Sequence, residues 1–376
     1  MLNPLVGKIL NLLADVGEAR LFQFKRILFI TAKTENLFCH SKKIFKNAEI
    51  FDRFENVNEL QNLLGKNKCF DMLVVNQVID NELEIILREI KFRYIAVFGV
   101  DISHLNLGAY SRKEIHDIGT IYFPVEKYFD IFMPIGPSDY AIADQSIKNK
   151  RKIFKNLREV YYCAAENLNL DAIRIEESAY PFSLSLLQSI LSTSSTRVGW
   201  YHQQLKQLYS TQIEETMLDD IVSMCSDLFF NNEVSFFEND IPIYTYGREV
   251  PHKPYFEHMQ NLHPQLRCFD NRSAISHHSV FQRKEIKELF HLVETMTGDS
   301  FYSSFLKSIK KEQLELSGAA EYEIYFNFLR LTNKKIVVRE PNYLDIGNFQ
   351  QGKNSTADYF AYHWYMRQKD DLIVEN

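Results

Sequence analysis

The feature that most constrains this fold is the alternation of short apolar runs with helical stretches in the first 125 residues. The apolar runs are RILFIT at 26–31, a shorter run at 49–54, FDMLVVN at 70–76 and YIAVFGV at 94–100. Strands that alternate with helices predict a parallel sheet with covered faces. We therefore expect a small Rossmann-like parallel α/β domain over residues 1–125, beginning with an amphipathic packing helix.

The first predicted strand-to-helix turn of this domain has no phosphate-binding loop. The sequence TAKT at residues 31–34 stands where a Gly-x-Gly-x-x-Gly pattern would let backbone N–H groups approach a pyrophosphate. We therefore assign no dinucleotide or methyl donor to residues 1–125. We expect an accessory domain that positions an acceptor, a partner subunit or a second protomer.

A second series of strands and helices begins with FDIFMPIGPSD at residues 129–139. An apolar strand is broken there by Pro134 and Gly136, and Ser138-Asp139 could cap the N-terminus of a helix. Strand-like runs follow at 159–163 and 172–175. This restart predicts a boundary near residue 125 and a second domain over residues 126–376.

Composition and charge exclude several classes of protein. The chain of 376 residues carries a net charge of −6, which argues against a nucleic-acid partner. It contains no apolar run of 18 residues and no signal-like start, so we expect a cytoplasmic protein with at most peripheral contact with the inner face of a membrane. Five scattered cysteines without a Cys-x-x-Cys pair predict neither a disulfide framework nor a structural zinc site.

Six segments of the second half occur in an order found in a known family. They are 129–139, Glu176-Glu177 ahead of Pro181-Phe182, 197–206 (RVGWYHQQLK), 221–230 (IVSMCSDLFF), 273–281 (SAISHHSVF) and 317–328 (SGAAEYEIYFNF). Through these segments, the region of about residues 128–335 resembles GT-A-like glycosyltransferases of bacterial capsule and surface-glycan loci. The resemblance implies a mixed-sheet domain that binds a nucleotide sugar. Residues 1–124 and most of 340–376 lie outside it.

The resemblance implies two groups of donor-binding residues. Pro134, Gly136 and Asp139 would hold a nucleoside at the end of the first strand, although a turn and a helix cap also explain these residue types. The second group shares one predicted helix, where a core or solvent-facing position is the competing interpretation. It consists of Trp200, Gln203, Gln204 and Lys206, the last of which could meet a donor phosphate.

The resemblance also implies a weakened metal site. The triplet Cys225-Ser226-Asp227 stands where related enzymes have Asp-x-Asp, which holds Mn²⁺ or Mg²⁺ and the donor diphosphate. A thiol is a poor ligand for these hard cations, so Asp227 is the catalytic residue expected to contact the metal or the donor ribose. A capping role in the following turn is the alternative for this residue.

Histidines and two glutamates complete the predicted site. His277 and His278 are adjacent on a predicted strand, so only one should face the site, and His278 is the candidate metal ligand. His252 could face an acceptor sugar. Glu321 and Glu323 do not share a helix face, so one of them could act as the general base.

We therefore expect a glycosyltransferase that moves a sugar from a nucleotide sugar, first of all a UDP-sugar, to a glycan or glycolipid acceptor in surface-polysaccharide synthesis. A homodimer is compatible with the sequence. One alternative is a catalytically silent relative that binds glycan or organises an assembly, which the cysteine at 225 favours. Another is a nucleotidyltransferase, which would want a glycine-rich basic loop after the first strand. A two-domain GT-B enzyme is the weakest rival.

Overall fold

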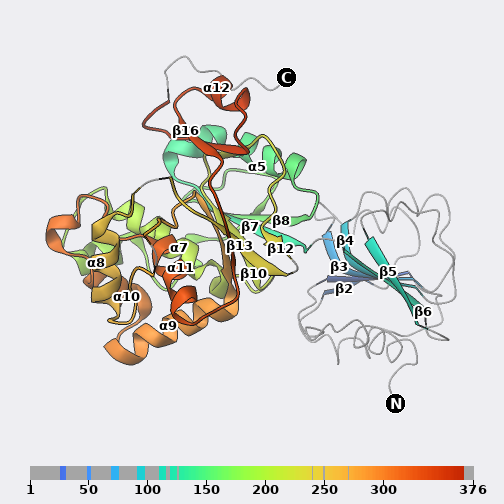
Figure 1. Cartoon of the computed structure of the whole chain (residues 1–376), viewed down its shortest axis with the longest axis horizontal. Helices are drawn as coiled ribbons and strands as arrows, with labels where there is room; N and C mark the ends of the chain where they lie inside the picture. Colours follow the sequence, from blue (N-terminus) through green and yellow to red (C-terminus); the bar gives the residue numbers. More distant parts are fainter. Residues whose placement is uncertain are drawn as a thin grey trace. The chain divides into compact units, whose positions relative to one another are not determined.

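The structure is a computed structural model that divides into two compact units, Met1–Tyr128 and Phe129–Asn376. It describes residues 127–367 except 239, 249 and 270, together with six strands in the first 126 residues. Figure 1 traces the chain and labels the elements used below.

The strands of the first unit form one mixed sheet. They are β1 (Arg26–Ile30), β2 (Glu49–Phe51), β3 (Cys69–Val75), β4 (Lys91–Val97), β5 (Tyr110–Ile115) and β6 (Gly119–Pro124). Their order is β2-β1-β3-β4-β6-β5. The first four strands pair in parallel. β6 runs antiparallel to β4, and β5 runs antiparallel to β6. The helices predicted for this unit and the 31–34 turn lie outside the described residues, so the accessory role stays a prediction.

The second unit is built on a sheet of five strands. They are β7 (Phe129–Pro134), β8 (Leu157–Cys163), β9 (Ile173–Arg174), β10 (Asp220–Met224) and β14 (His278–Gln282), in the order β14-β10-β7-β8-β9. Only β14 runs antiparallel to its neighbour. The chain passes from β7 to β8 on one side and later to β10 on the other. The strand order therefore reverses between β7 and β10, which is where open α/β sheets bind ligands.

Helices cover this sheet and set its packing. They are α5 (Tyr140–Ile153), α6 (Leu184–Leu191), α7 (Val198–Ile213), α8 (Lys253–Leu262), α9 (Arg283–Thr297), α10 (Phe301–Lys307), α11 (Glu321–Leu331) and α12 (Phe349–Lys353). The predicted helix at 197–206 is confirmed as the start of α7, which contacts β7 and packs on α6, α9 and α11. In Figure 1, α7 to α11 gather on the left, whereas α5 lies near β16 and α12 at the top.

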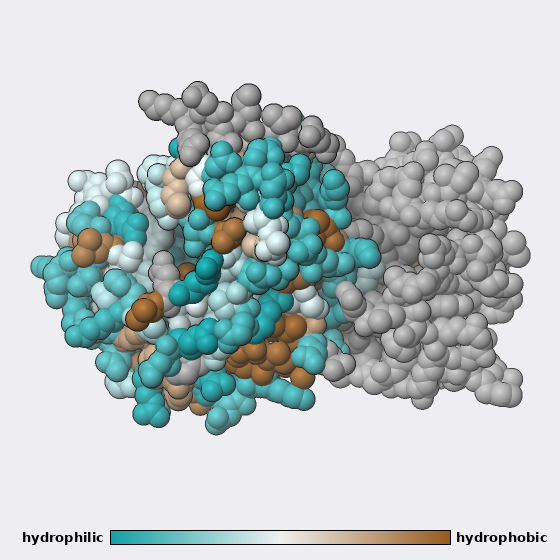
Figure 2. Space-filling model, turned by 45° about the horizontal axis from the view of Figure 1, so that its top comes forward, coloured by the Kyte–Doolittle hydropathy of each residue, from teal (hydrophilic) through white to brown (hydrophobic). Residues whose placement is uncertain are grey.

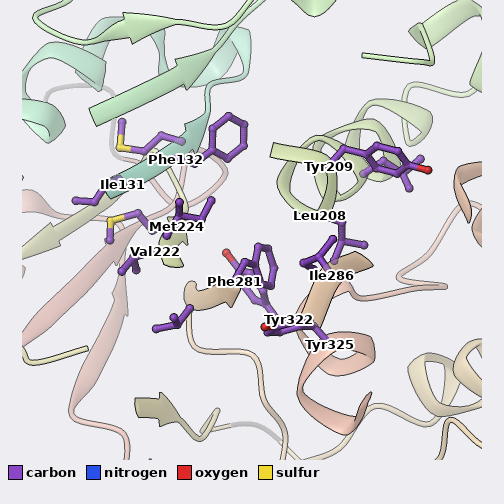
Figure 3. Packing of buried hydrophobic residues seen from close by; sticks show 14 of the residues in the cluster. Ile131, Phe132, Leu208, Tyr209, Val222, Met224, Phe281, Ile286, Tyr322 and Tyr325 are labelled. Atoms are coloured by element: carbon purple, nitrogen blue, oxygen red, sulfur yellow. The ribbon is translucent and has the colours of Figure 1, made fainter. Parts of the chain in front are cut away.

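The core joins the sheet to this helical layer, as Figure 3 shows. Apolar side chains of β7, β10 and β14 belong to the same buried cluster as side chains of α7, α9 and α11. The labelled residues are Ile131, Phe132, Val222, Met224, Phe281, Leu208, Tyr209, Ile286, Tyr322 and Tyr325. Each buried large apolar side chain contributes roughly 1.5–3 kcal/mol by removal from water. The apolar strand runs of the sequence therefore fix the sheet as an interior layer.

Two small sheets extend the second unit. One contains β11 (Leu228–Phe230), β17 (Tyr359–Tyr362) and β16 (Tyr343–Ile346), in that neighbour order; the other contains β12 (Phe237–Glu238), β13 (Ile241–Thr245) and β15 (Val337–Arg339). β11 begins directly after Asp227, and its partner β17 ends directly before His363. The first small sheet thereby brings the C-terminal segment to the carboxyl edge of the central sheet.

A buried ion pair joins the amino ends of β7 and β8. Arg158 donates from Nε to Asp130 Oδ1 at 2.8 Å and from Nη2 to Asp130 Oδ2 at 2.5 Å. The same carboxylate accepts from Leu218 N at 2.7 Å, and Arg158 also donates to the carbonyl of Thr216. The pair is therefore fully hydrogen-bonded, which a buried charge requires.

The described surface of the second unit is largely hydrophilic in the view of Figure 2, with separate hydrophobic patches. Among the residues that the structure describes, no helix combines the length and the apolar character that a membrane crossing requires.

Candidate functional site

The candidate site lies at the carboxyl ends of β7 and β10. After β7, residues 135–136 turn into a short 3-10 helix, Pro137–Asp139, and α5 follows. After β10, Cys225 donates its backbone N–H to the carbonyl of His277 at 2.9 Å. Because β14 is antiparallel, its beginning lies at the same edge as the end of β10. The parallel pair β7–β10 therefore brings Asp139 and Asp227 to one edge, and the antiparallel β14 brings His277 there.

Asp139 links the two strand ends. Ser226 Oγ donates to Asp139 Oδ2 at 2.6 Å, and Arg367 Nη2 donates to Asp139 Oδ1 at 2.6 Å. Arg367 also donates to the carbonyl of Ser138 at 2.7 Å. Asp139 occupies the N-cap position of α5 but makes no side-chain cap hydrogen bond. Burial, and then the nearby charge of Asp227, raise the pKa of Asp139, while Ser226 and Arg367 oppose this shift.

Asp227 is the first member of a series of carboxylates and imidazoles that contact one another. His363 Nδ1 lies 3.1 Å from Asp227 Oδ2, and His363 Nε2 lies 3.0 Å from Asp345 Oδ1. His277 Nε2 lies 2.9 Å from the same Asp345 oxygen. Burial alone would raise the pKa of Asp227, but the hydrogen bond and charge of His363 hold it below its ordinary value. In return, despite burial, the two carboxylates raise the pKa of His363 to about 9.

His277 and His278 face different surroundings, as expected for neighbours at a strand. His277 lies beside Asp345 and His363, with its ring edge-on to Tyr343 at 5.2 Å. His278, the predicted metal ligand, is buried and contacts the rings of Phe236 and Tyr359. Its Nε2 has no hydrogen-bond partner, and burial lowers its pKa well below the ordinary value. Among the described residues, the group able to hold a metal is His277, Asp345 and His363, without His278.

The predicted donor residues of α7 are engaged elsewhere. Gln204 donates to the carbonyl of Ala319 at 3.1 Å, and Lys206 pairs with Glu177 at 2.8 Å. The Arg197 guanidinium lies 4.0 Å from the centre of the Trp200 ring. Gln203 is half-buried. The hydrogen bonds and ion pairs of these four residues do not connect them with Asp139 or Asp227.

The remaining predicted residues are placed as follows. Pro134 is the buried last residue of β7. Gly136 has φ −83°, and an added Cβ would have 3.9 Å to its nearest neighbour, so neither conformation nor space demands glycine there. His252 is exposed, and its Nε2 lies 3.1 Å from the carbonyl of Ser317. None of these three contacts the Asp227–His363 pair through a hydrogen bond that the described structure contains.

Glu321 and Glu323, both on α11, have different environments. Glu323 Oε1 accepts from Ser273 Oγ at 2.8 Å and from Ala274 N at 3.0 Å, which ties α11 to the segment before β14. Glu321 accepts from Gln207 Nε2 at 2.7 Å, and Gln207 is itself bonded by Ser223 and Tyr322. Burial raises the pKa of Glu321 to about 7. A carboxyl with a pKa near 7 suits a general base at neutral pH.

Cys225 and Lys150 lie beneath the Asp227 turn. Burial, and then Asp227, raise the pKa of Cys225 well above its ordinary value, so it is a neutral thiol. Lys150 is buried on α5 and donates to the carbonyl of Leu228 at 2.7 Å and to Ser146 Oγ at 2.6 Å. Burial lowers the pKa of Lys150 to about 7. Lys150 therefore fixes the turn that carries Asp227.

Sequence reasoning missed Asp345, His363, Arg367 and Lys150. The first three lie beyond the segments that carry the family resemblance, in short aromatic strands and the stretch after them. The one sequence signal that could have indicated these three residues is the presence of charged and imidazole side chains beside the aromatic runs. Lys150 was hidden in a lysine-rich helix, where a solvated position is the ordinary expectation.

No protein-family profile and no curated protein sequence matches the chain. Among solved structures, the chain is similar to mouse xyloside xylosyltransferase 1 in its apo form, with a TM-score of 0.38 and 7% sequence identity. The alignment covers 64% of this chain and 99% of that chain. A similarity of this degree assigns neither a reaction nor a residue to this protein.

Proposed function

We propose that the second unit is a glycosyltransferase that binds a nucleotide sugar, with UDP-sugars as first candidates, at the carboxyl edge of the five-stranded sheet. Its acceptor is the hydroxyl of a glycan or glycolipid in surface-polysaccharide synthesis. The observation that carries this proposal is the meeting of Asp139, Asp227 and His363 where the strand order reverses. Open α/β sheets bind nucleotides at this position, and the GT-A resemblance of residues 128–335 points to the same two strand ends.

Asp139 and Asp227 have separate roles in the proposed site. Asp139 follows the first strand of the unit, where its carboxylate accepts hydrogen bonds from ribose hydroxyls or a base imide. Ser226 and Arg367 hold this carboxylate in place before a ligand arrives. Asp227 is ionised, because His363 lowers its pKa, and we assign it to the diphosphate side of the proposed donor site.

A divalent cation is part of the proposal, with Mn²⁺ or Mg²⁺ implied by the family resemblance. The residues present fit Mn²⁺ better than Mg²⁺, because His277 and His363 offer imidazoles beside the carboxylate of Asp345. When bound, the ion would neutralise charge on the leaving diphosphate. The neutral thiol of Cys225 contributes nothing to that task.

The chemical step is attack of the acceptor hydroxyl oxygen on the anomeric carbon. The new C–O bond forms, the bond from that carbon to the phosphate oxygen breaks, and the nucleoside diphosphate leaves with the electron pair. The hydroxyl proton passes to a base, for which Glu321 is the candidate because its pKa of about 7 permits proton exchange near neutrality.

The second candidate is a catalytically silent binding protein. Cys225 favours it, since the position of the first acid of Asp-x-Asp carries a protonated thiol. The nucleotidyltransferase alternative is less favoured, because residues 135–139 contain no basic residue and the nearby Arg367 is occupied by Asp139.

Calorimetry on the full chain with UDP, GDP and CDP, with and without Mn²⁺, tests the proposal. We expect one nucleoside diphosphate to bind in the presence of Mn²⁺, and Asp227→Asn to weaken binding at least about tenfold, or ~1.4 kcal/mol. The matched control is Asp144→Asn on α5, because the exposed Asp144–Lys148 pair is worth little.

Release of nucleoside diphosphate from nucleotide sugars in the presence of glycan acceptors separates the two candidates. Binding without acceptor-dependent release would identify the silent protein. Absence of binding by all three diphosphates at millimolar concentration would contradict both the nucleotide site and the transfer reaction.

A further inference from the structure

Three side chains from three separate segments converge beside the Asp227 turn. His277 Nε2 and His363 Nε2 lie 2.9 Å and 3.0 Å from the same oxygen of Asp345. One ligand atom from each of these residues lies within 4.8 Å of the others. Ligand atoms bound at about 2.1 Å and at right angles lie roughly 3 Å apart, given the usual metal–nitrogen and metal–oxygen distances. The separation of Asp345 from each histidine therefore matches that of neighbouring ligands in one coordination shell.

The backbone holds His277 in a conformation that few side chains adopt. Its φ is 65°, in the left-handed region, and its carbonyl accepts the hydrogen bond from Cys225 N. Such conformations cost about 1–3 kcal/mol for residues other than glycine and gather at functional sites. With this backbone conformation, the side chain of His277 lies in the cluster, whereas that of the adjacent His278 is buried in the core.

The second nitrogen of His363 is already oriented. His363 Nδ1 lies 3.1 Å from Asp227 Oδ2, which leaves Nε2 directed at Asp345. Metal-binding histidines usually donate their other N–H to a carboxylate, which fixes the tautomer and the ring. Asp227 is thus placed as a positioning residue for His363.

The cluster is accessible to an ion from solvent. The side chains of His277 and His363 are 15% exposed, and that of Asp345 is 37% exposed. The neighbouring His278 is 2% exposed by comparison. An ion can therefore reach the cluster without opening of the core.

We propose that His277, Asp345 and His363 form a divalent-metal site with two imidazole ligands, in which Asp227 orients His363. Imidazole nitrogens suit Mn²⁺, Co²⁺ and Zn²⁺, whereas Mg²⁺ prefers oxygen ligands. The site therefore selects these transition metals over Mg²⁺. Cys225 is not a ligand, so loss of the Asp-x-Asp pattern leaves metal binding intact. The inference concerns metal binding alone and does not require sugar transfer.

Metal titrations of the full chain, stripped by a chelator and free of nucleotide, test this site. We expect Mn²⁺ and Co²⁺ to bind with one ion per chain and at least about tenfold tighter than Mg²⁺, or ~1.4 kcal/mol. Visible absorption of bound Co²⁺ reports its ligands directly. His277→Ala, Asp345→Asn and His363→Ala should each weaken binding at least about tenfold and change that spectrum, whereas the control His252→Ala should change neither. Circular dichroism shows whether each variant is folded.

The Asp227→Asn variant tests whether Asp227 orients His363 or binds the metal directly. We expect this variant to bind Co²⁺ about tenfold more weakly, in the range found for residues behind a ligand, while the Co²⁺ absorption bands keep their positions. Failure of Mn²⁺ and Co²⁺ to bind the full chain would overturn the site, and so would folded His277→Ala and Asp345→Asn variants with unchanged affinity. Metal binding without nucleotide binding would leave this site standing while the proposed function fails.

Discussion

The two ends of the central sheet of the second unit use charged residues in opposite ways. At the amino ends of β7 and β8, Asp130 and Arg158 form one matched pair with side chains 0% and 7% exposed. At the carboxyl ends, the carboxylates of Asp139, Asp227 and Asp345 meet the Arg367 guanidinium and the imidazoles of His277 and His363, and the side chain of Asp345 is 37% exposed.

The difference separates a structural ion pair from a binding site. The Asp130 carboxylate accepts hydrogen bonds from Arg158 and Leu218 and is closed to solvent, so it is not placed to contact a ligand. At the other end, burial and then the nearby charge of Asp227 raise the pKa of Asp139, whereas His363 holds the pKa of Asp227 below its ordinary value. A cation or a hydrogen-bond donor would stabilise that end.

The largest expected effect is loss of stability at the amino end. Asp130→Asn leaves Arg158 as a buried charge without its partner, and breaking such a pair costs about 3–5 kcal/mol. Urea denaturation should record this loss, with Asp144→Asn as a control that stays within about 0.5 kcal/mol of the native chain. A loss below ~1 kcal/mol would mean that the pair is not the structural anchor of this edge.

A smaller effect is expected from Glu321, which lies below the carboxyl end. Its folded pKa of about 7 exceeds its ordinary value of 4.5, so the folded chain binds more protons between these pH values. The corresponding stability is fully present below pH 4.5 and is lost as the pH rises through about 7. At pH 8, Glu321→Gln should therefore be more stable than the native chain by roughly 3 kcal/mol, at 1.36 kcal/mol per pKa unit.

Denaturation of both proteins between pH 4.5 and 8 measures this difference. The two stability curves should converge at the acidic end, since Glu321 is protonated there in both the folded and the unfolded chain. Parallel curves over the whole range would show that Glu321 does not carry the raised pKa.

The smallest effect is expected from Cys225→Asp. The new carboxylate adds an oxygen donor near Asp227, where the native thiol is protonated. We expect Mn²⁺ to bind about threefold tighter, which is under ~1 kcal/mol, because the imidazoles already supply ligands. Calorimetric titration with Mn²⁺ checks this, with Cys163→Ser as a control at another strand end. An unchanged affinity would place position 225 outside the coordination sphere.

Local pattern was sufficient for the mixed α/β class and for the strands on which the site is built. The apolar runs at 129–134 and 221–224 became buried β7 and β10, and the RVGWYHQQLK segment began α7. The parallel pairing of β1 to β4 also agrees with the alternation seen in the sequence. These features depend on hydrophobic periodicity within a few residues, which a single sequence contains.

The roles of individual polar residues were less accessible. The periodicity of a strand indicates that only one of two adjacent histidines faces a site, but it does not say which, and the structure turns His277 rather than His278 toward Asp345. Similarly, the capping role that the pattern offered for Asp139 is absent, because Ser226 and Arg367 engage its carboxylate. Lys206 satisfied its charge with Glu177, a partner whose proximity depends on how α7 packs.

The sequence by itself determined the buried strands β7 and β10, the start of α7 and the position of Asp139 and Asp227 after two strand ends. Only the tertiary structure decided that Asp345, His363 and Arg367 complete this edge. His363 and Asp227 are 136 residues apart, and they meet because β17 pairs with β11 and β16. The choice of a strand's partners depends on the packing of the whole unit, and no local pattern encodes a contact over that separation.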